Sequence, residues 1–170
     1  MDPPLRAWGA LPEEFTLSNF ARADAFAGML AFDTFVGNCD RHIRNLICRE
    51  VNSNCWEIYL IDHAHIFANA EWLAKPALPT YPLPDALTPR SVIRDDMPRL
   101  AQLYAAAVTD LKTVGPVLTK IEALSDLMLN EFIDNISDVY ASSEHLFTMK
   151  QILRLRRDAI RTLFATYFDE

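Results

Sequence analysis

A short stretch of clustered prolines divides this chain. Five of the ten prolines fall between residues 76 and 89, within the run KPALPTYPLPDALTP. Proline has no backbone N–H and a fixed φ angle, so this density excludes a regular helix or a central strand. We therefore expect a surface loop over residues 74–90, with ordered structure before and after it.

The segment before this loop predicts one helix and one hairpin. Residues 16–36 carry apolar side chains at helical spacing, with Ser18 as a candidate N-cap and Gly37 as a candidate C-terminal stop. The β-prone runs LIC and EIYLI follow, on either side of VNSNCW, in which Asn-Ser-Asn favours a turn. These signals indicate a helix that leads into a small antiparallel hairpin.

The segment after the loop predicts a helical tail over residues 95–170. Three helices are expected, with Pro98 and Pro116 in the first turns of the first two, where proline is well tolerated. The whole chain, 1–170, is thus expected to form a single, mainly α domain with a small β-hairpin. The predicted helices cover residues 98–114, 116–135 and 144–168. The last carries a basic stripe, expected to be a solvated face, at Lys150, Arg154, Arg157 and Arg161.

Charge and composition exclude several classes of partner. The net charge of −7 gives no general basic field for nucleic acid or an anionic membrane, so any phosphate chemistry must be local and aided by a cation. No apolar run reaches the roughly 18 residues that span a bilayer. Three cysteines without a C-x-x-C pair do not suggest a disulfide framework. A cytoplasmic protein is expected.

Two short motifs carry residues suited to phosphoryl transfer. DRHIRN spans residues 40–45, and IDHAH follows the second predicted strand at residues 61–65. Phosphoryl transfer needs a carboxylate beside the acceptor hydroxyl and oxygen ligands that hold Mg²⁺ against the nucleotide phosphates. Asp40 fits the first role, and Asn45 and Asp62 fit the second. This spacing is the layout of the catalytic loop and metal-binding aspartate in protein kinases.

The same segments resemble the bacterial HipA-like kinases, with phosphatidylinositol 3- and 4-kinases as more distant relatives. FDTFVGNCDRHIRNLI looks like their catalytic loop, and WEIYLIDHAHIF looks like their metal-binding segment. The resemblance is specific over about residues 24–67, with the catalytic and metal segments at residues 33–67. It implies the C-terminal lobe of a protein-kinase-like fold, with ATP and Mg²⁺ as cofactors and a protein Ser/Thr hydroxyl as acceptor. It also implies a place for His42 beside Asp40 in the catalytic loop. The loop is similar as well to the Asp-x-His-x-x-Asn loop of aminoglycoside phosphotransferases.

The N-terminal part of the chain differs from that of these kinases. A complete kinase has an N-terminal lobe with a phosphate-holding lysine, yet no lysine precedes Asp40 and too few residues precede it for such a lobe. The chain is then a fragment, a subunit whose partner carries the N-terminal lobe, or a catalytically silent helical interaction module. A lone lobe should expose apolar surface where its partner packs. Residues 1–17, with Leu5, Trp8, Leu11 and Phe15, are expected to form that junction.

Several single residues have two interpretations. His42 either belongs to the catalytic loop chemistry or holds the loop by a backbone hydrogen bond. Arg41 and Arg44 either face phosphates or pair with surface acids. His63 and His65 could suggest zinc, but no third and fourth ligands appear at suitable spacing. Packing roles are expected for Trp56, Tyr59 and Phe67, and a buried, inert thiol is expected for Cys39.

Overall fold

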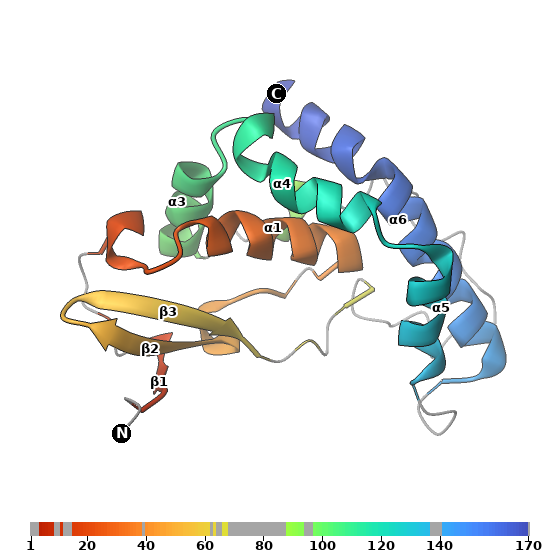
Figure 1. Cartoon of the computed structure of the whole chain (residues 1–170), viewed down its shortest axis with the longest axis horizontal. Helices are drawn as coiled ribbons and strands as arrows, with labels where there is room; N and C mark the ends of the chain where they lie inside the picture. Colours follow the sequence, from red (N-terminus) through yellow and green to blue (C-terminus); the bar gives the residue numbers. More distant parts are fainter. Residues whose placement is uncertain are drawn as a thin grey trace.

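The computed structural model of the chain describes residues 4–8, 11, 15–38, 40–61, 63, 66–67, 88–93, 97–136 and 141–169. These residues form helices together with one three-stranded antiparallel sheet, so the predicted mainly α class with a small β component is confirmed. Figure 1 shows helix α1 at the centre, with the sheet on one side and α4 and α6 on the other.

The elements follow one another in this order: β1 (Arg6–Ala7), η2 (Leu17–Asn19), α1 (Asp24–Val36), η3 (Ile43–Asn45), β2 (Leu46–Asn52), β3 (Cys55–Leu60), α2 (Pro89–Val92), α3 (Pro98–Ala107), α4 (Leu111–Glu122), α5 (Asp126–Asp134) and α6 (Ser143–Asp169). Both η2 and η3 are short 3₁₀ turns. Within the described part of the chain, no helix is long and apolar enough to cross a membrane.

The predicted hairpin is present as β2 and β3. They pair antiparallel from Leu46 opposite Leu60 to the turn, where Asn54 adopts a positive φ of 58°. Asparagine tolerates this left-handed conformation better than most residues, which is why Asn-Ser-Asn predicted the turn correctly. The sheet also has a third strand that the sequence did not predict, because β1 has only two residues and is defined by its pairing with β2.

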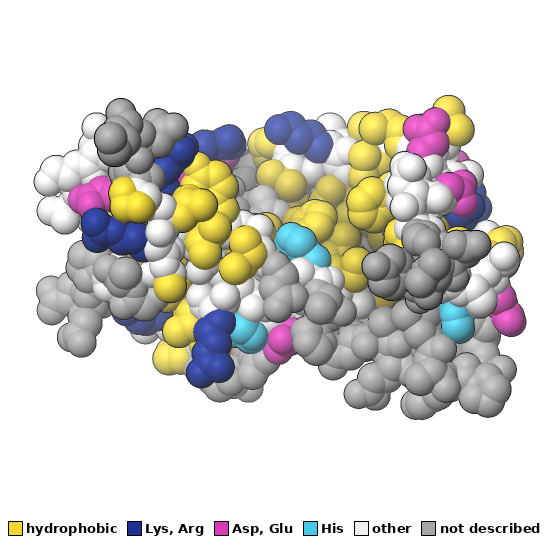
Figure 2. Space-filling view, turned by 90° about the horizontal axis from the view of Figure 1, so that it is seen from below, with side chains coloured by type: hydrophobic (Ala, Val, Ile, Leu, Met, Phe, Trp, Pro, Cys, Tyr) yellow, Lys and Arg dark blue, Asp and Glu magenta, His cyan; other side chains and the backbone are white. Residues whose placement is uncertain are grey.

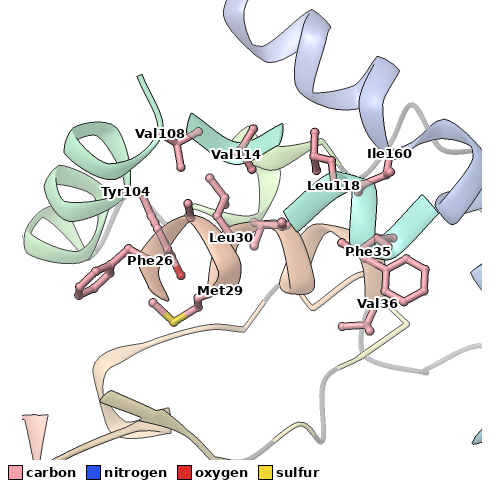
Figure 3. Packing of buried hydrophobic residues seen from close by; sticks show 14 of the residues in the cluster. Phe26, Met29, Leu30, Phe35, Val36, Tyr104, Val108, Val114, Leu118 and Ile160 are labelled. Atoms are coloured by element: carbon pink, nitrogen blue, oxygen red, sulfur yellow. The ribbon is translucent and has the colours of Figure 1, made fainter. Parts of the chain in front are cut away.

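Helix α1 is buried along most of its length. Nine of its thirteen residues are inaccessible, and it contacts α2, α3, α4 and α6. Figure 3 shows how side chains from α1, including Leu30 and Phe35, pack among residues of the surrounding helices, including Leu118. Gly37 ends the helix in the left-handed conformation at φ 67°, so the predicted C-terminal stop is confirmed.

The predicted start of this helix at residue 16 is wrong. Thr16 instead caps the short turn η2, its backbone N–H donating to Asn19 Oδ1 at 2.8 Å. Phe20 then forms an isolated bridge with Trp56 of β3, and the helix begins only at Asp24. This long-range bridge holds the backbone extended, so Ser18 lies inside the turn and is not the cap of the long helix.

The backbone carbonyls at the C-terminal end of α1 accept hydrogen bonds from three separate parts of the chain. The last four carbonyls of any helix lack partners within the helix. Here Asp33 O accepts the backbone N–H groups of Gly37 and Asn38, and Val36 O accepts that of Phe67 at 2.8 Å. The remaining two carbonyls, of Thr34 and Phe35, accept from the guanidinium of Arg156 on α6, with Nε 2.9 Å from each. Every carbonyl of this buried helix end is therefore satisfied.

The helices after the loop differ in detail from the prediction. Pro98 does begin α3, but α4 begins at Leu111 and contains Pro116 as its sixth residue. Asp110 caps α4 by accepting the backbone N–H groups of Lys112 and Thr113 at 2.8 and 2.9 Å. The carbonyl that Pro116 leaves without a helical donor belongs to Lys112, an exposed residue, so water can reach this end of the helix.

The predicted proline-rich loop and basic stripe also need correction. Residues 74–87 of the loop lie outside the described part, and its expected end is wrong because Pro89 begins α2. The stripe on α6 is not simply a solvated face, since its cations pair with acids of α4 and α5. The pairs are Lys150–Asp134, Arg154–Asp126, Arg157–Asp126 and Arg161–Glu122.

The N-terminal junction is likewise not exposed as expected. Trp8 and Leu11 are buried in the core, at 2% and 7% exposure, and Trp8 packs against Phe15, Phe20 and Phe26. Only Leu5 is strongly exposed, at 56%. Of the four residues expected at the junction, Trp8 and Leu11 therefore belong to the chain's own core, Phe15 packs partly buried against it, and Leu5 is exposed.

Candidate active site

The candidate site is built on a buried ion pair at the end of α1. The Asp33 carboxylate accepts two hydrogen bonds from Arg41, at 2.8 Å from Nε to Oδ2 and 2.8 Å from Nη2 to Oδ1. Neither side chain is exposed to solvent. Arg41 was expected to contact a phosphate or to pair with a surface acid, and both expectations are wrong. Its acidic partner is the buried Asp33.

Asn38 connects this ion pair to the candidate catalytic residue. Its Nδ2 donates to Asp33 Oδ1 at 2.8 Å, and its Oδ1 accepts the backbone N–H of Asp40 at 3.2 Å. Asn38 is itself buried, and its bond to Asp33 is shielded from water. The backbone at Asp40 is thus fixed to helix α1 through one amide side chain.

Asp40 and His42 lie side by side at the edge of the site. His42 Nδ1 accepts the backbone N–H of Arg44 at 3.1 Å, so the interpretation of His42 as a residue that holds the loop is confirmed. Its Nε2 lies 3.6 Å from Asp40 Oδ2. Because Nδ1 is an acceptor, a neutral ring carries its proton on Nε2, toward the carboxylate. Both side chains are about one fifth exposed and so accessible to a ligand.

Asn45 binds back to the first residue of the loop formed by residues 40–45. Its Nδ2 donates to the Asp40 carbonyl at 3.1 Å, and Asn45 is 3% exposed. This bond uses the amide donor and not Oδ1, the atom that a metal ion would need. The backbone carbonyl of Asn45 also accepts the N–H of Ile61 at 3.0 Å, which places the end of β3 next to the loop.

Asp62, His65 and Cys39 lie outside the described residues, so the expected convergence of Asp62 and Asn45 stays a prediction. His63 is described and exposed: its Nδ1 lies 3.2 Å from Arg41 Nη2, and its ring meets the Phe32 ring edge to face. Among the described side chains, no group of three or more His, Cys, Asp or Glu is placed to hold a metal.

Burial alters two titratable groups near the site and in the sheet. Burial, together with the negative charge of Asp33, raises the pKa of Tyr104 well above its usual range. Its phenolic oxygen has no hydrogen-bond partner among the residues that the structure describes. Burial also raises the pKa of the Cys48 thiol on β2 to about 11. Neither group is an acid, base or nucleophile at neutral pH.

Sequence reasoning missed Asp33 and Asn38 as site residues. A usable signal existed for Asp33, because it is the one charged residue in the largely apolar run from Ala25 to Val36. A carboxylate in a buried helix needs a cationic or hydrogen-bonding partner. Arg41 is the nearest arginine that follows it in the sequence, and the structure shows that it is this partner.

An apolar groove lies beside the site, between α1, α4, α5 and α6. Its volume is about 340 Å³, and Phe32, which touches His63, forms part of its wall. Figure 2 shows hydrophobic side chains gathered around a histidine on the lower face of the molecule. The groove is lined by Phe32, Phe35, Val36, Ile121, Leu124, Met128, Leu129, Phe132 and Leu153. Of these, Phe132 and Met128 are more than half exposed.

Comparison with known proteins gives no relative: no family model, no curated protein and no solved structure matches the chain.

Proposed function

We propose that this chain is the catalytic lobe of a cytoplasmic, HipA-like, ATP-dependent phosphotransferase that acts on a protein Ser/Thr hydroxyl. It works with an N-terminal lobe supplied from elsewhere. One observation carries the proposal: the loop from Asp40 to Asn45 is closed on itself and joined to the end of β3, directly before Asp62. A catalytic loop and a metal-binding strand end must be adjacent in this way.

The proposed roles follow from the chemistry of each side chain. Asp40 orients the acceptor hydroxyl and takes its proton, since its carboxylate is accessible at the edge of the site. His42 presents Nε2–H toward that carboxylate and holds the loop through Nδ1. Asn45 through Oδ1, and Asp62 through its carboxylate, would hold Mg²⁺. Oxygen donors of this kind suit a hard cation, which would neutralise the charge of the ATP phosphates.

A second candidate function is a catalytically silent interaction module that keeps the loop as architecture. The apolar groove favours it, because exposed apolar patches on soluble proteins commonly mark partner sites. The Nδ2 of Asn45 also has a structural use in bracing Asp40. In this alternative the chain binds a protein partner and no metal.

Metal binding separates the two candidates. The chain is titrated with Mn²⁺, a paramagnetic substitute for Mg²⁺, and free Mn²⁺ is measured by electron paramagnetic resonance. For the catalytic lobe we expect Asn45→Ala and Asp62→Asn each to weaken binding at least about tenfold, which corresponds to about 1.4 kcal/mol. The matched controls are the exposed residues Asn52 and Asp24, as Asn52→Ala and Asp24→Asn, which should bind as wild type does. Absence of binding, or equal binding by all variants, contradicts the proposal.

Nucleotide binding tests the need for a second lobe. Because no lysine precedes Asp40, the isolated chain should bind Mg²⁺–ATP more weakly than micromolar in titration calorimetry. A micromolar or tighter dissociation constant would show that the chain holds nucleotide without a partner lobe.

A further inference from the structure

Arg41 is hydrogen-bonded to both chain neighbours of position 62. Its Nη1 donates to the Ile61 carbonyl at 3.1 Å, and its Nη2 lies 3.2 Å from His63 Nδ1. Arg41 therefore holds Ile61 and His63 through a single guanidinium group.

The orientation of this guanidinium is itself fixed by helix α1. Asp33 binds Nε and Nη2 with its two oxygens, in a pair that is wholly buried. A planar guanidinium can make this two-point contact and still direct donors to other acceptors, whereas the ammonium of lysine is a single point. Asn38 holds Asp33 in turn at 2.8 Å. One rigid group thus joins the central helix to the end of β3.

Arg41 also determines which nitrogen of His63 carries the proton. Arginine has only donors, so a hydrogen bond to Nδ1 requires that nitrogen to be unprotonated. The neutral ring then has its proton on Nε2. The ring is held further by its edge-to-face contact with Phe32, at 5.6 Å between centroids.

We propose that Arg41 is a positioning residue that holds Ile61 and His63 against the loop of residues 40–45 and keeps His63 in the Nε2–H tautomer. Where Asn45 and Asp62 hold a metal, as proposed above, loss of this positioning should weaken that binding. The consequence for metal binding rests on the proposed function, but the positioning itself does not.

The first test is a nitrogen NMR spectrum of the full chain with ¹⁵N-labelled histidine at about pH 8, where histidine is ordinarily neutral. In wild type, His63 should show an unprotonated Nδ1. In Arg41→Lys, its signals should move toward a mixture of tautomers. His42 should keep its signals, because its acceptor bond comes from the nearby backbone N–H of Arg44. A protonated Nδ1 of His63 in wild type overturns the proposal even where the variant does not fold.

The second test is amide hydrogen exchange in the same proteins. Exchange at residues 61–63 should be at least about tenfold faster in Arg41→Lys, beyond any uniform change that reflects global stability. Arg22→Lys is the matched control, because the exposed Arg22 pairs only with its neighbour Asp24 among the described residues. Unchanged exchange at residues 61–63, with an unchanged His63 spectrum, overturns the proposal.

Mn²⁺ titration tests whether the positioning by Arg41 affects metal binding at the candidate active site. If wild type binds Mn²⁺, Arg41→Lys should bind at least about tenfold more weakly and Arg22→Lys equally well. Equal binding by Arg41→Lys and wild type overturns the positioning role of Arg41. If wild type binds no Mn²⁺, the proposed phosphotransferase function fails, while the His63 tautomer and the exchange rates still decide the role of Arg41.

Discussion

Replacing Arg156 by methionine should destabilise the protein strongly, because Arg156 supplies the donors for the end of the central helix. Its side chain is 2% exposed and donates to the Thr34 and Phe35 carbonyls. Methionine fills a similar volume but has no donor, so both carbonyls become buried acceptors without a hydrogen bond. The guanidinium charge, which is favourable at a helix C-terminus, is lost as well.

The magnitude follows from these contacts. A buried polar group left without its hydrogen bond costs about 1–3 kcal/mol, which gives about 2–6 kcal/mol for two carbonyls. Removing a buried guanidinium recovers part of this, since the cation no longer has to be desolvated. We therefore expect Arg156→Met to lower the free energy of unfolding by about 2–4 kcal/mol. Arg156→Lys keeps the charge but not the forked donor, so about half of that loss is expected.

Urea denaturation followed by far-ultraviolet circular dichroism measures this loss. Arg161→Met is the matched control on the same helix, because Arg161 pairs with Glu122 on the surface and such pairs contribute at most about 1 kcal/mol. An Arg156→Met loss no larger than that of Arg161→Met would refute the reasoning. It would show that water or a rearranged helix end satisfies the two carbonyls.

Three further predictions concern other parts of the fold. The pKa of Cys48 is raised in the folded chain, so its thiol keeps its proton until about pH 11, whereas the thiol of the unfolded chain loses its proton above pH 9. The stability that this group contributes below pH 9 is therefore lost between pH 9 and pH 11. The loss is at most about 2.7 kcal/mol, and urea midpoints measured across this range should fall less steeply in Cys48→Ala. Asp110→Ala should cost about 1 kcal/mol in the same assay through loss of the α4 cap, and an unchanged midpoint would disprove the cap's contribution. Asp62→Asn, measured with chelator, should be neutral or slightly stabilising if Asp62 is a metal ligand, whereas a cost of about 1–3 kcal/mol would favour the structural module.

Local signals in the sequence were sufficient for the elements that depend on local chemistry. The hairpin turn follows from Asn54 and its neighbours, and the end of α1 follows from Gly37, which takes a positive φ. The start of α1 could not be found in this way, because the bridge from Phe20 to Trp56 joins residues 36 positions apart. Strand β1 likewise exists only through its pairing with β2.

The start of α4 was predicted wrongly because a weaker helix-start signal was preferred to a stronger one. Pro116 suggested a helix start, but Asp110 satisfies two backbone N–H groups and so determines where the helix begins. A proline that removes one donor near an exposed carbonyl is the weaker effect. The sequence contained both signals, and the energetic ranking of the two was needed to choose between them.

The candidate site was predictable to a similar extent. The residues from Asp40 to Asn45 lie in one short loop, so their proximity follows from the chain itself. The partner of Arg41 did not follow, because an arginine in a loop is ordinarily a surface residue. Only the packing of the loop against the end of α1 shows that Arg41 is enclosed together with Asp33.

The end of helix α1 also constrains the order in which the chain can fold. Arg156 lies 122 residues after Thr34, so the two contacts that complete this helix end connect distant parts of the chain. Contacts of such separation form late, because a long loop must close first. During synthesis, residues 34–38 and the loop that follows leave the ribosome well before Arg156 is made. The proposed catalytic loop therefore reaches its final geometry only after most of α6 has emerged.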